Sequence, residues 1–440
     1  MRILLAVHHF PPNFTGGAEW EAYRIASNLI NHSHQVQVLS VERVINSKKN
    51  TLSWEDDFYK DVPVRRLFLE MSSAYGEFTS WEYDNPLIGQ HIEKLITEFK
   101  PDVFHLISGY LLTGRCLRVA KELNIPTVLS LEDFWFLCRR ITMLRSDGKL
   151  STLPIDPVVC AQCIGEEKAT YKFLGEKFPG IMKTYWKSQK SAIGLFKDRK
   201  AFSIETLNDV DVIISRSHFL QDFHIRAGVD KNRIVLSRQG LNIENVHPEK
   251  KEPTRDKGKL RIGYLGQIAP VKGVHILIKS LQMIDDPHIE LKIYGNEAAF
   301  PEYSAQLRKI SEKDTRIQFS GKYLHDALFQ VMQGLDIVVV PSLWYENSPN
   351  VILEAFITNT PVIASDMGGM AELVKHKENG LLFKVGDIKD LTVQIQSLLD
   401  DPSLLNRLKR GIGPVKSIAT EVDELEKIYH SVIEEKAACV

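Results

Sequence analysis

Two glutamates could bind a ligand in the stretch WYENSPNVILEAF: Glu346 and Glu354, eight residues apart. The Ser-Pro between them is typical of a helix start, where backbone amides attract an anion. Like charges at contact distance repel, so the two carboxylates cannot both bind that anion. They can instead accept hydrogen bonds from neutral hydroxyls, Glu346 from the loop and Glu354 from one turn inside the helix. Hydroxyls on both sides of a diphosphate describe a nucleotide sugar.

The helix start would bind the anion itself. We expect Ser348 to be the N-cap and Pro349 the first helical residue, because serine caps helices well and proline suits the first turn. The amides of Asn350 and Val351 would then face the ligand at the positive end of the helix dipole. Other glutamate pairs in the chain share the eight-residue spacing, so the prediction depends on the strand, loop and capped helix around this pair.

Two further segments that follow predicted strands suit a phosphorylated ligand. In QIAPVKG, Lys272 can supply a point charge and Gly273 allows a close backbone approach. In HHFPPNFTGGAE, Gly16 and Gly17 open the helix that follows the first strand. Parallel α/β sheets bind ligands at the carboxyl ends of their strands, so all three segments are expected to meet at one cleft.

Short β-branched runs alternate with amphipathic segments in both halves, as in βαβ units with parallel sheets. In the first half the pattern predicts helices such as Ala18–Ile30 and Pro86–Phe99, and strands at Ile3–Val7, Val36–Leu39, Val64–Phe68, Val103–Ile107, Thr127–Leu131, Val212–Ser215 and Ile234–Leu236. In the second half it predicts strands at RIGYLG, ELKIYG, RIQFSG, DIVVVPS and PVIASD. The expected fold class is α/β, with two Rossmann-like domains facing across a cleft.

A chain of 440 residues exceeds the size of one core, so two domains are expected. The charged segment 248–259 is the predicted linker between a first domain at 1–247 and a second at 260–420. The last segment, 421–440, carries an apolar stripe at helical spacing, and the first domain is a candidate partner for it.

The composition narrows the function classes. With 55 basic and 56 acidic residues the net charge is −1, so no global field recruits nucleic acid. The apolar run in the opening MRILLAVHHF is too short for a signal peptide. Five cysteines are an odd number in a long chain, which favours a reducing compartment over a disulfide scaffold. We expect a soluble protein of the cytoplasm, with peripheral contact to the inner face of the membrane as an option.

Residues 138–203 break the strand-helix rhythm. Between Lys168 and Lys200 there are nine Lys or Arg against two acids, Glu176 and Asp198, with aromatic residues interleaved. One interpretation is a helical insertion with a solvated cationic face. The other is a surface that contacts anionic lipid or a phosphate-bearing acceptor, because cations beside amphipathic aromatics suit a membrane interface.

The second half resembles the donor domain of the retaining family-four glycosyltransferases of GT-B fold. The resemblance is carried by Lys272-Gly273, by the segment from Glu346 to Glu354, and by Asn379–Phe383, NGLLF. It implies that Glu354 binds the ribose hydroxyls, that Glu346 binds the transferred sugar, and that Lys272 with the helix amides binds the diphosphate. Negative charge on the leaving diphosphate would be stabilised electrostatically, with no cofactor and no metal required for catalysis.

The first half resembles the acceptor domain of the same family. The matching segments are Gly16–Glu19, GGAE; Pro101–His105, PDVFH; and Glu132–Cys138, EDFWFLC. The resemblance implies that Gly16 and Gly17 assist donor binding. It also implies transfer to a lipid-linked or soluble glycan acceptor, with the anomeric configuration of the donor retained.

The chain departs from the family pattern at several polar positions. Gln267 stands where the family usually has an arginine, so phosphate binding would depend more on Lys272. His105 is not followed by a second histidine two residues on, and Glu132-Asp133 replace a usual His-Asp. Together with His9, Glu132 and Asp133 form the predicted acceptor side. His105 is either a catalytic or sugar-positioning group or a structural histidine at a strand end.

Three cysteines in the insertion, Cys138, Cys160 and Cys163, could supply thiolates to a structural zinc or be buried free thiols. A closed zinc site takes four ligands, and no fourth cysteine is near in sequence.

The competing functions are a nucleotide-sugar hydrolase or epimerase of the same fold, and a nucleotide-sugar-binding pseudoenzyme. A dehydrogenase fits poorly, because the first loop has no G-x-G-x-x-G.

Overall fold

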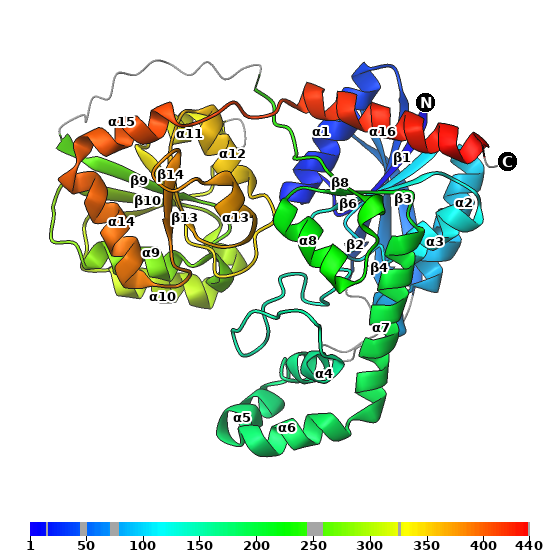
Figure 1. Ribbon diagram of the computed structural model, residues 1–440, viewed down its shortest axis with the longest axis horizontal. Coiled ribbons are helices and arrows are strands. Elements are labelled where there is room, and N and C mark those ends of the chain that lie inside the picture. The colour runs from blue at the N-terminus through cyan, green and yellow to red at the C-terminus, as the bar shows by residue number, and fades with distance from the viewer. Residues whose placement is uncertain (15, 45–50, 71–78, 244–257, 324–326, 439–440) are drawn as a thin grey trace. The chain divides into compact units, whose positions relative to one another are not determined.

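The computed structural model describes residues 1–14, 16–44, 51–70, 79–243, 258–323 and 327–438 (Figure 1). The chain divides into two compact units, which we call unit 1, Met1–Gln239 with Ile418–Val440, and unit 2, Gly240–Ser417. The predicted linker, 248–259, falls almost entirely on residues outside those described. Each unit has its own sheet and its own core.

Unit 1 contains an eight-stranded sheet in the order β3-β4-β2-β1-β5-β6-β7-β8. Its strands are β1 (Arg2–His8), β2 (Gln35–Arg43), β3 (Thr51–Tyr59), β4 (Val62–Glu70), β5 (Val103–Ile107), β6 (Thr127–Leu131), β7 (Val212–Ser215) and β8 (Ile234–Leu236). All neighbours pair in parallel except β3 and β4, which are antiparallel. The carboxyl ends of β1, β5 and β6 therefore share one edge, at which the predicted acceptor residues lie.

Helices cover both faces of this sheet. Alternate side chains of β1, such as Ile3 and Leu5, pack in one apolar cluster with α1 (Gly17–Asn31) and α16 (Ile418–Ala438). The helices α2 (Pro86–Phe99), α3 (Arg115–Glu122) and α7 (Lys190–Asp209) pack together beside β1, β5 and β6, and α8 (His218–Ala227) packs on β7 and β8. The last helix of the chain thus belongs to the core of unit 1.

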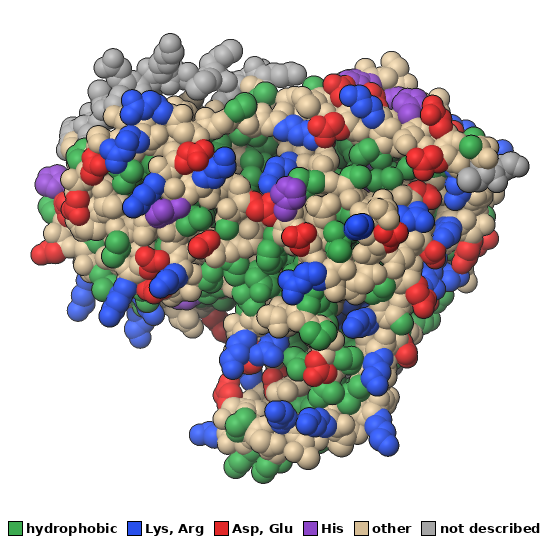
Figure 2. All heavy atoms as spheres, in the orientation of Figure 1, with side chains coloured by type: hydrophobic (Ala, Val, Ile, Leu, Met, Phe, Trp, Pro, Cys, Tyr) green, Lys and Arg blue, Asp and Glu red, His purple; other side chains and the backbone are tan. Residues whose placement is uncertain are grey.

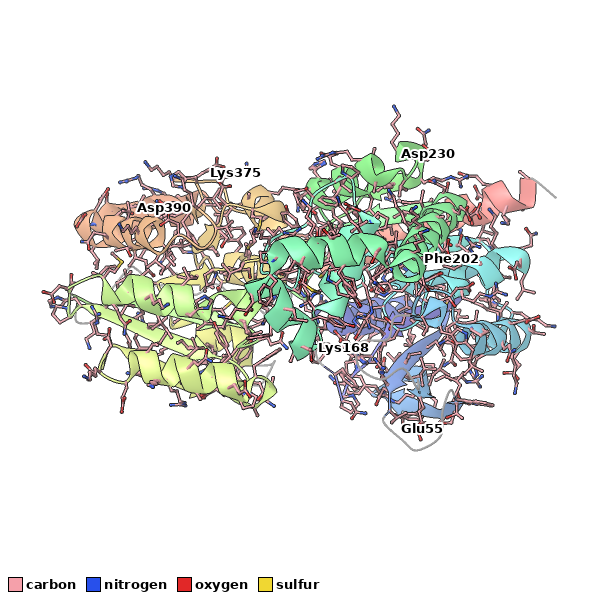
Figure 3. All side chains as sticks on the ribbon, turned by 90° about the horizontal axis from the view of Figure 1, so that it is seen from below. Glu55, Lys168, Phe202, Asp230, Lys375 and Asp390 are labelled. Carbon is pink, nitrogen blue, oxygen red and sulfur yellow. The ribbon has the colours of Figure 1, made fainter. Side chains whose placement is uncertain are left out.

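The segment predicted as a helical insertion contains α4 (Pro157–Gly165), α5 (Ala169–Lys177) and α6 (Pro179–Ser188), and it continues into α7. Figure 1 shows α4, α5 and α6 at the far end of α7 from the sheet of unit 1. They have a small core of their own, in which Trp186 and Met182 pack with Phe196. At its other end α7 is fixed by Arg118 of α3, whose guanidinium lies 4.0 Å from the ring centre of Phe202 (labelled in Figure 3).

Unit 2 contains a six-stranded parallel sheet in the order β11-β10-β9-β12-β13-β14. Its strands are β9 (Leu260–Leu265), β10 (Ile289–Tyr294), β11 (Ile317–Gly321), β12 (Ile337–Val340), β13 (Val362–Ser365) and β14 (Gly380–Phe383). One face packs on α9 (Val274–Gln282), α10 (Pro301–Ser311), α14 (Ile388–Asp400) and α15 (Pro402–Arg410). The other face packs on α11 (Leu328–Gln333), α12 (Asn350–Ile357) and α13 (Gly368–Leu373).

Short 3-10 turns complete the description: η1 (Ser80–Glu82), η2 (Lys231–Arg233), η4 (Pro270–Lys272) and η5 (Glu297–Ala299). Among the described residues, no helix has the length and apolar character needed to cross a membrane.

Two strands, β3 and β14, were not predicted. The three acids of β3 obscure its alternation, but two of them have partners on β4: Asp56 pairs with Arg65 at 2.7 Å and Asp57 with Arg66 at 3.1 Å. An exposed antiparallel edge strand gains from such opposite charges. The short β14 consists of the last four residues of the NGLLF motif.

Candidate active site

Lys272 is positioned by a tight loop between β9 and α9 in unit 2. It ends the 3-10 turn η4 and is followed by Gly273, whose φ of +71° is left-handed. A β-carbon at Gly273 would lie 1.9 Å from the carbonyl oxygen of Pro341, so only glycine fits between the two loops. This close approach brings Lys272 to the segment that follows β12.

Glu346 accepts three hydrogen bonds at a single oxygen, Oε1. The donors are Lys272 Nζ at 2.7 Å, Ser342 Oγ at 2.7 Å and Trp344 Nε1 at 3.0 Å. The ammonium of Lys272 also lies 5.0 Å from the ring centre of Trp344. The Glu346 side chain is 8 % exposed and that of Lys272 27 %, so the pair has a buried acid and a cation that reaches solvent.

Gly368 and Gly369 support the backbone of Glu346. The amide of Gly369 donates to the Glu346 carbonyl at 2.8 Å. A β-carbon at Gly369 would lie 1.4 Å from the carbonyl oxygen of Asn347. The two glycines therefore let the start of α13 contact the loop that holds Glu346.

The helix α12 begins one residue later than predicted. Pro349 is the N-cap, with an extended ψ of 117°, and Asn350 is the first helical residue, so Ser348 is not the cap. Proline has no polar side-chain atom to cap the first turn, and the N-cap makes no side-chain hydrogen bond. Asn350 and Val351 thus supply the first two amides of the helix, as predicted.

Glu354 lies on α12 and is half-buried. Burial and then the negative charge of Glu354 raise the pKa of Tyr323. Gln267, after β9, is exposed, and its carbonyl accepts a hydrogen bond from Tyr264 at 2.6 Å. Gln267 adds no charge, so Lys272 is the cation that the structure brings to Glu346.

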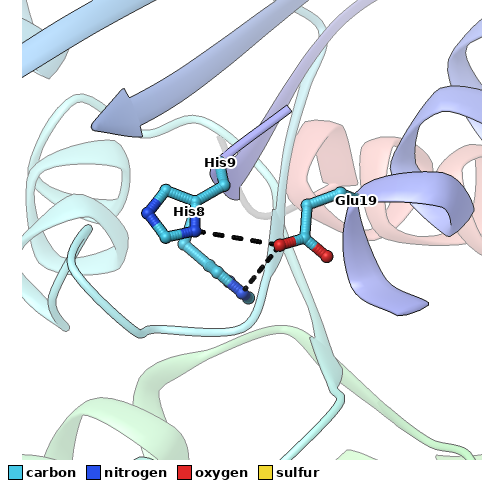
Figure 4. Close-up of side chains that lie close together, drawn as sticks. All are labelled: His8, His9 and Glu19. Carbon is cyan, nitrogen blue, oxygen red and sulfur yellow. Dashed lines mark ion pairs between the residues drawn. The ribbon is translucent and has the colours of Figure 1, made fainter. Parts of the chain in front are cut away.

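The predicted first-loop residues of unit 1 lie beside a carboxylate. His9 follows β1 with a left-handed φ of 58°, and its ring stacks on Phe14 at 3.8 Å. Glu19, in the first turn of α1, lies 3.8 Å from both His9 Nδ1 and His8 Nε2 (Figure 4). Gly16 is the N-cap of α1, and a β-carbon there would lie 2.5 Å from Glu19 Oε2, so its lack of a side chain makes room for the acid.

Glu132 and Asp133 follow β6 but have different partners. Glu132 accepts from the buried Arg216 at 3.1 Å, and burial raises the pKa of Glu132 despite that cation. Asp133 accepts from Ser108 Oγ at 2.8 Å and from the Trp135 amide at 2.7 Å. Burial raises the pKa of Asp133 to about 6. Asp133 is thus a carboxyl group that titrates close to neutral pH.

His105 lies inside the sheet of unit 1. It is fully buried in β5, with Nδ1 2.7 Å from the Tyr429 hydroxyl and Nε2 2.9 Å from Ser130 Oγ. Burial lowers the pKa of His105 to about 3, so the ring is neutral. Both ring nitrogens are used by buried hydroxyls, which favours the structural interpretation of this histidine.

Cys138, Cys160 and Cys163 line one cavity of the insertion together with Arg199. Burial raises the pKa of Cys160 to about 12. Within the described part of the chain, the sets of three metal-ligand atoms that lie within 4.8 Å of one another do not include these thiols. No disulfide joins these three cysteines, and a closed zinc site takes four ligands, so the structural zinc stays a prediction.

Several site residues were not predicted. Ser342 and Trp344 precede Glu346 by four and two residues, and this closeness in sequence is the signal that could have found them. Glu19 belongs to the GGAE motif, but its contact with His8 depends on how β1 and α1 meet. Arg216 carries no local signal at all, because its carboxylate partners come from distant segments.

Comparison with known proteins identifies the class. Residues 15–245 match the family model described as Glycosyltransferase Family 4, and residues 246–412 match the one described as Glycosyl transferases group 1. The first match alone covers more than half of the chain, so the chain belongs to glycosyltransferase family 4. It is a group 1 glycosyltransferase, which uses a nucleotide sugar.

Relatives and solved structures agree with this class. The chain is 22 % identical over 405 residues to an uncharacterized 42.6 kDa protein in the cps region of Klebsiella pneumoniae, covering 89 % of this chain and 91 % of that one. It is 28 % identical over 194 residues to D-inositol 3-phosphate glycosyltransferase of Rhodococcus opacus (strain B4), covering 41 % and 43 %.

Anabaena HepE, solved in complex with UDP, superposes with a TM-score of 0.65 at 17 % identity, covering 98 % of this chain and 100 % of that one. Sucrose-phosphate synthase of Thermosynechococcus elongatus gives a TM-score of 0.66 at 16 % identity, covering 98 % and 99 %. These likenesses confirm the predicted GT-B fold.

Proposed function

We propose that the protein transfers a sugar from a nucleoside-diphosphate sugar to a hydroxyl acceptor in the biosynthesis of a polysaccharide or other glycoconjugate, with retention of the anomeric configuration. The observation that carries this proposal is the Lys272–Glu346 pair beside the start of α12. A cation, an acid and the first amides of a helix at the carboxyl edge of one parallel sheet match a ligand with a diphosphate and hydroxyls. The Klebsiella relative in a cps region supports the polysaccharide context.

Lys272 and the first amides of α12 would bind the diphosphate and stabilise the charge that grows on it as the sugar leaves. Preorganised donors of this kind act strongly in a water-poor site and need no metal ion. Lys272 is the more exposed partner of its pair, so it can turn from Glu346 to an incoming phosphate without unfolding the loop. Glu346 would then accept from hydroxyls of the transferred sugar.

Glu346 and Glu354 would bind opposite parts of the donor. The three bonds to Glu346 all use Oε1, and Oε2 receives none of them, so Oε2 is the oxygen offered to a sugar hydroxyl. Glu354, on the next element, would accept from the ribose hydroxyls. His9 and Asp133, at the carboxyl edge of the unit 1 sheet, would contact the acceptor.

The acceptor side would include an anionic membrane surface that presents a lipid-linked acceptor. On α5 and α6, Phe173 is 57 % exposed, Phe178 52 % and Ile181 69 %. The same two helices and their ends carry exposed lysines: Lys168, Lys172, Lys177, Lys183, Lys187 and Lys190. Figure 2 shows hydrophobic and basic side chains intermixed on the surface of this part of unit 1. Such a mixture is typical of helices that lie in a membrane interface.

A thermal-shift screen with nucleoside diphosphates and their sugars, followed by transfer assays with lipid-linked and soluble acceptors, tests the main proposal. We expect a nucleoside diphosphate to raise the melting temperature, and UDP is the first to try because HepE was solved with it. Donor binding without turnover would instead favour a pseudoenzyme. Release of free sugar without acceptor would favour a hydrolase.

Co-sedimentation with vesicles of anionic and of neutral lipid tests the membrane contact. We expect the triple exchange Phe173→Ser, Phe178→Ser and Ile181→Ser to lower binding to anionic vesicles. Val393→Ser is the matched control, because Val393 is 60 % exposed on α14 of unit 2. Equal binding of both variants would show that α5 and α6 do not contact the membrane.

A further inference from the structure

Three metal-ligating side chains converge at the carboxyl end of β1. His8 is the last residue of the strand, His9 follows it, and Glu19 lies in the first turn of α1. Glu19 Oε1 is 3.8 Å from His8 Nε2 and 3.8 Å from His9 Nδ1, and all three atoms lie within 4.8 Å of one another (Figure 4). A separation of 3.8 Å is too long for a hydrogen bond, and each contact is an ion pair only when the histidine carries a proton.

The spacing of these atoms is close to that of a metal shell. Zinc-type ions bond to imidazole nitrogen and carboxylate oxygen at about 2.0–2.2 Å, which puts neighbouring tetrahedral ligands about 3.4 Å apart. The observed 3.8 Å exceeds this by a few tenths of an ångström, within the reach of small side-chain rotations. Two imidazoles and one carboxylate are a donor set suited to zinc, cobalt, nickel or ferrous iron.

The surrounding residues hold the three ligands in place. The His9 ring stacks on Phe14 at an interplanar angle of 7°, and the His8 ring meets the edge of Tyr110 at 5.4 Å. The left-handed φ of His9 is a sparsely populated conformation that the fold maintains at this point. The absence of a side chain at Gly16 leaves space for the Glu19 carboxylate, which would otherwise be displaced.

We propose that His8, His9 and Glu19 form a binding site for one divalent transition-metal ion. The three side chains are 14 %, 19 % and 10 % exposed, so the site is sheltered but open to solvent. Three protein ligands leave at least one coordination position for an oxygen ligand such as water. The site lies within unit 1 and shares His9 with the proposed acceptor side, so a bound ion would lie beside the acceptor, whereas the leaving-group charge is assigned to Lys272.

A second group, His32, Asp423 and Glu426, has similar residue types but a different character. Glu426 Oε1 already accepts from His32 at 2.9 Å and from His34 at 2.7 Å. These direct bonds occupy the space that an ion would need, and His32 and Asp423 are exposed. The group therefore supplies a matched control rather than a second site.

Titration of the metal-free full-length protein with cobalt(II), followed by visible absorption, tests the proposal. We expect one equivalent to bind, with visible d–d bands and no thiolate-to-metal charge-transfer band. Glu19→Gln and His8→Gln should each weaken binding by more than about tenfold, the lower end of what even outer-shell changes cost a metal site. The double exchange His32→Gln and Glu426→Gln should leave binding unchanged.

X-ray absorption of the cobalt-loaded wild-type protein keeps the test decisive if a variant fails to fold. Two imidazole ligands with oxygen in the remaining positions support the proposal, and sulfur ligands would assign the ion to Cys138, Cys160 and Cys163 instead. Three results would each overturn the proposed metal site: no stoichiometric binding, a sulfur shell around the ion, or loss of binding in the His32 and Glu426 control.

Discussion

Lys272 Nζ lies 2.7 Å from Glu346 Oε1, although 74 residues separate them in sequence. The pair joins the loop after β9 to the loop after β12, and Ser342 and Trp344 donate to the same oxygen. A buried carboxylate is costly unless it is paired and hydrogen-bonded, so Lys272 stabilises Glu346 when no anion is present. A diphosphate would compete with Glu346 for Lys272. Donor binding would therefore release Glu346 from Lys272, and Glu346 could then bind the sugar.

Glu346→Gln should impair transfer while sparing affinity for a nucleoside diphosphate. The exchange removes the anion that competes for Lys272, so diphosphate affinity should stay the same or rise. It also removes a charged acceptor for sugar hydroxyls, which costs about 1.5–3 kcal/mol, roughly 10- to 150-fold in transfer rate. Calorimetric titration of the nucleoside diphosphate and a transfer assay measure the two effects separately.

Glu354→Gln should show the opposite pattern and weaken nucleoside diphosphate affinity by a similar factor. The amide can donate to only one ribose oxygen and accepts weakly at the other, so the charged hydrogen bonds are lost. The same titration measures this loss. Equal losses of nucleotide affinity in the Glu346 and Glu354 variants would contradict the assignment of the two acids to different parts of the donor.

Gly369→Ala should disrupt the loop that positions Glu346. The new β-carbon would lie 1.4 Å from the Asn347 carbonyl oxygen, so the start of α13 or the loop must move. Overpacking of this kind costs about 1–3 kcal/mol, and the hydrogen bond from the Gly369 amide to Glu346 is lost with it. We expect a lower melting temperature together with a lower transfer rate.

Gly413→Ala is the control for that exchange. A β-carbon at Gly413 meets no atom within 4 Å, and this glycine lies in the same unit. Its free energy of unfolding should change by less than about 0.5 kcal/mol. If Gly369→Ala retained wild-type transfer and stability, the close packing of α13 on the Glu346 loop would not be needed for either.

The sequence predicted four strands of unit 1 well. The bounds of β5, β6, β7 and the edge strand β8 are those predicted, because each is a short run of mainly apolar residues. The edge strand β3 was missed, since its acids become favourable only opposite the arginines of β4. A strand can thus be predicted from its own residues where burial stabilises it, but not where charges on a distant partner strand stabilise it.

Only part of the candidate site could be predicted, because some of its contacts join residues that are distant in sequence. Lys272, Glu346 and the start of α12 stand in motifs whose residues lie near one another in sequence, and unit 2 brings them together as expected. The ion pair between Lys272 and Glu346 was not predicted, because each had been assigned to a different part of the ligand. His105 looked functional in its motif, but its partner Tyr429 lies 324 residues away on α16.

His105→Asn should make unit 1 less sensitive to acid. Burial lowers the pKa of His105 from 6.5 to about 3, and Tyr429 and Ser130 use both ring nitrogens. Below pH 6.5 the unfolded chain binds a proton at this residue that the folded chain does not, so stability is lost as the pH falls toward 3. The slope is about 1.4 kcal/mol per pH unit for this group.

Urea unfolding of the wild-type and variant proteins at about pH 7.5 and about pH 5.5 gives the free energy of unfolding at each pH. The loss of this free energy between the two pH values should be about 1.4 kcal/mol smaller in the variant. Asparagine lowers stability at both pH values because it fills the space incompletely, so the change with pH is the informative quantity. Other buried histidines, such as His224, are common to both proteins and cancel. A catalytic His105 would instead give a variant with an unchanged pH slope and no transfer activity at any pH.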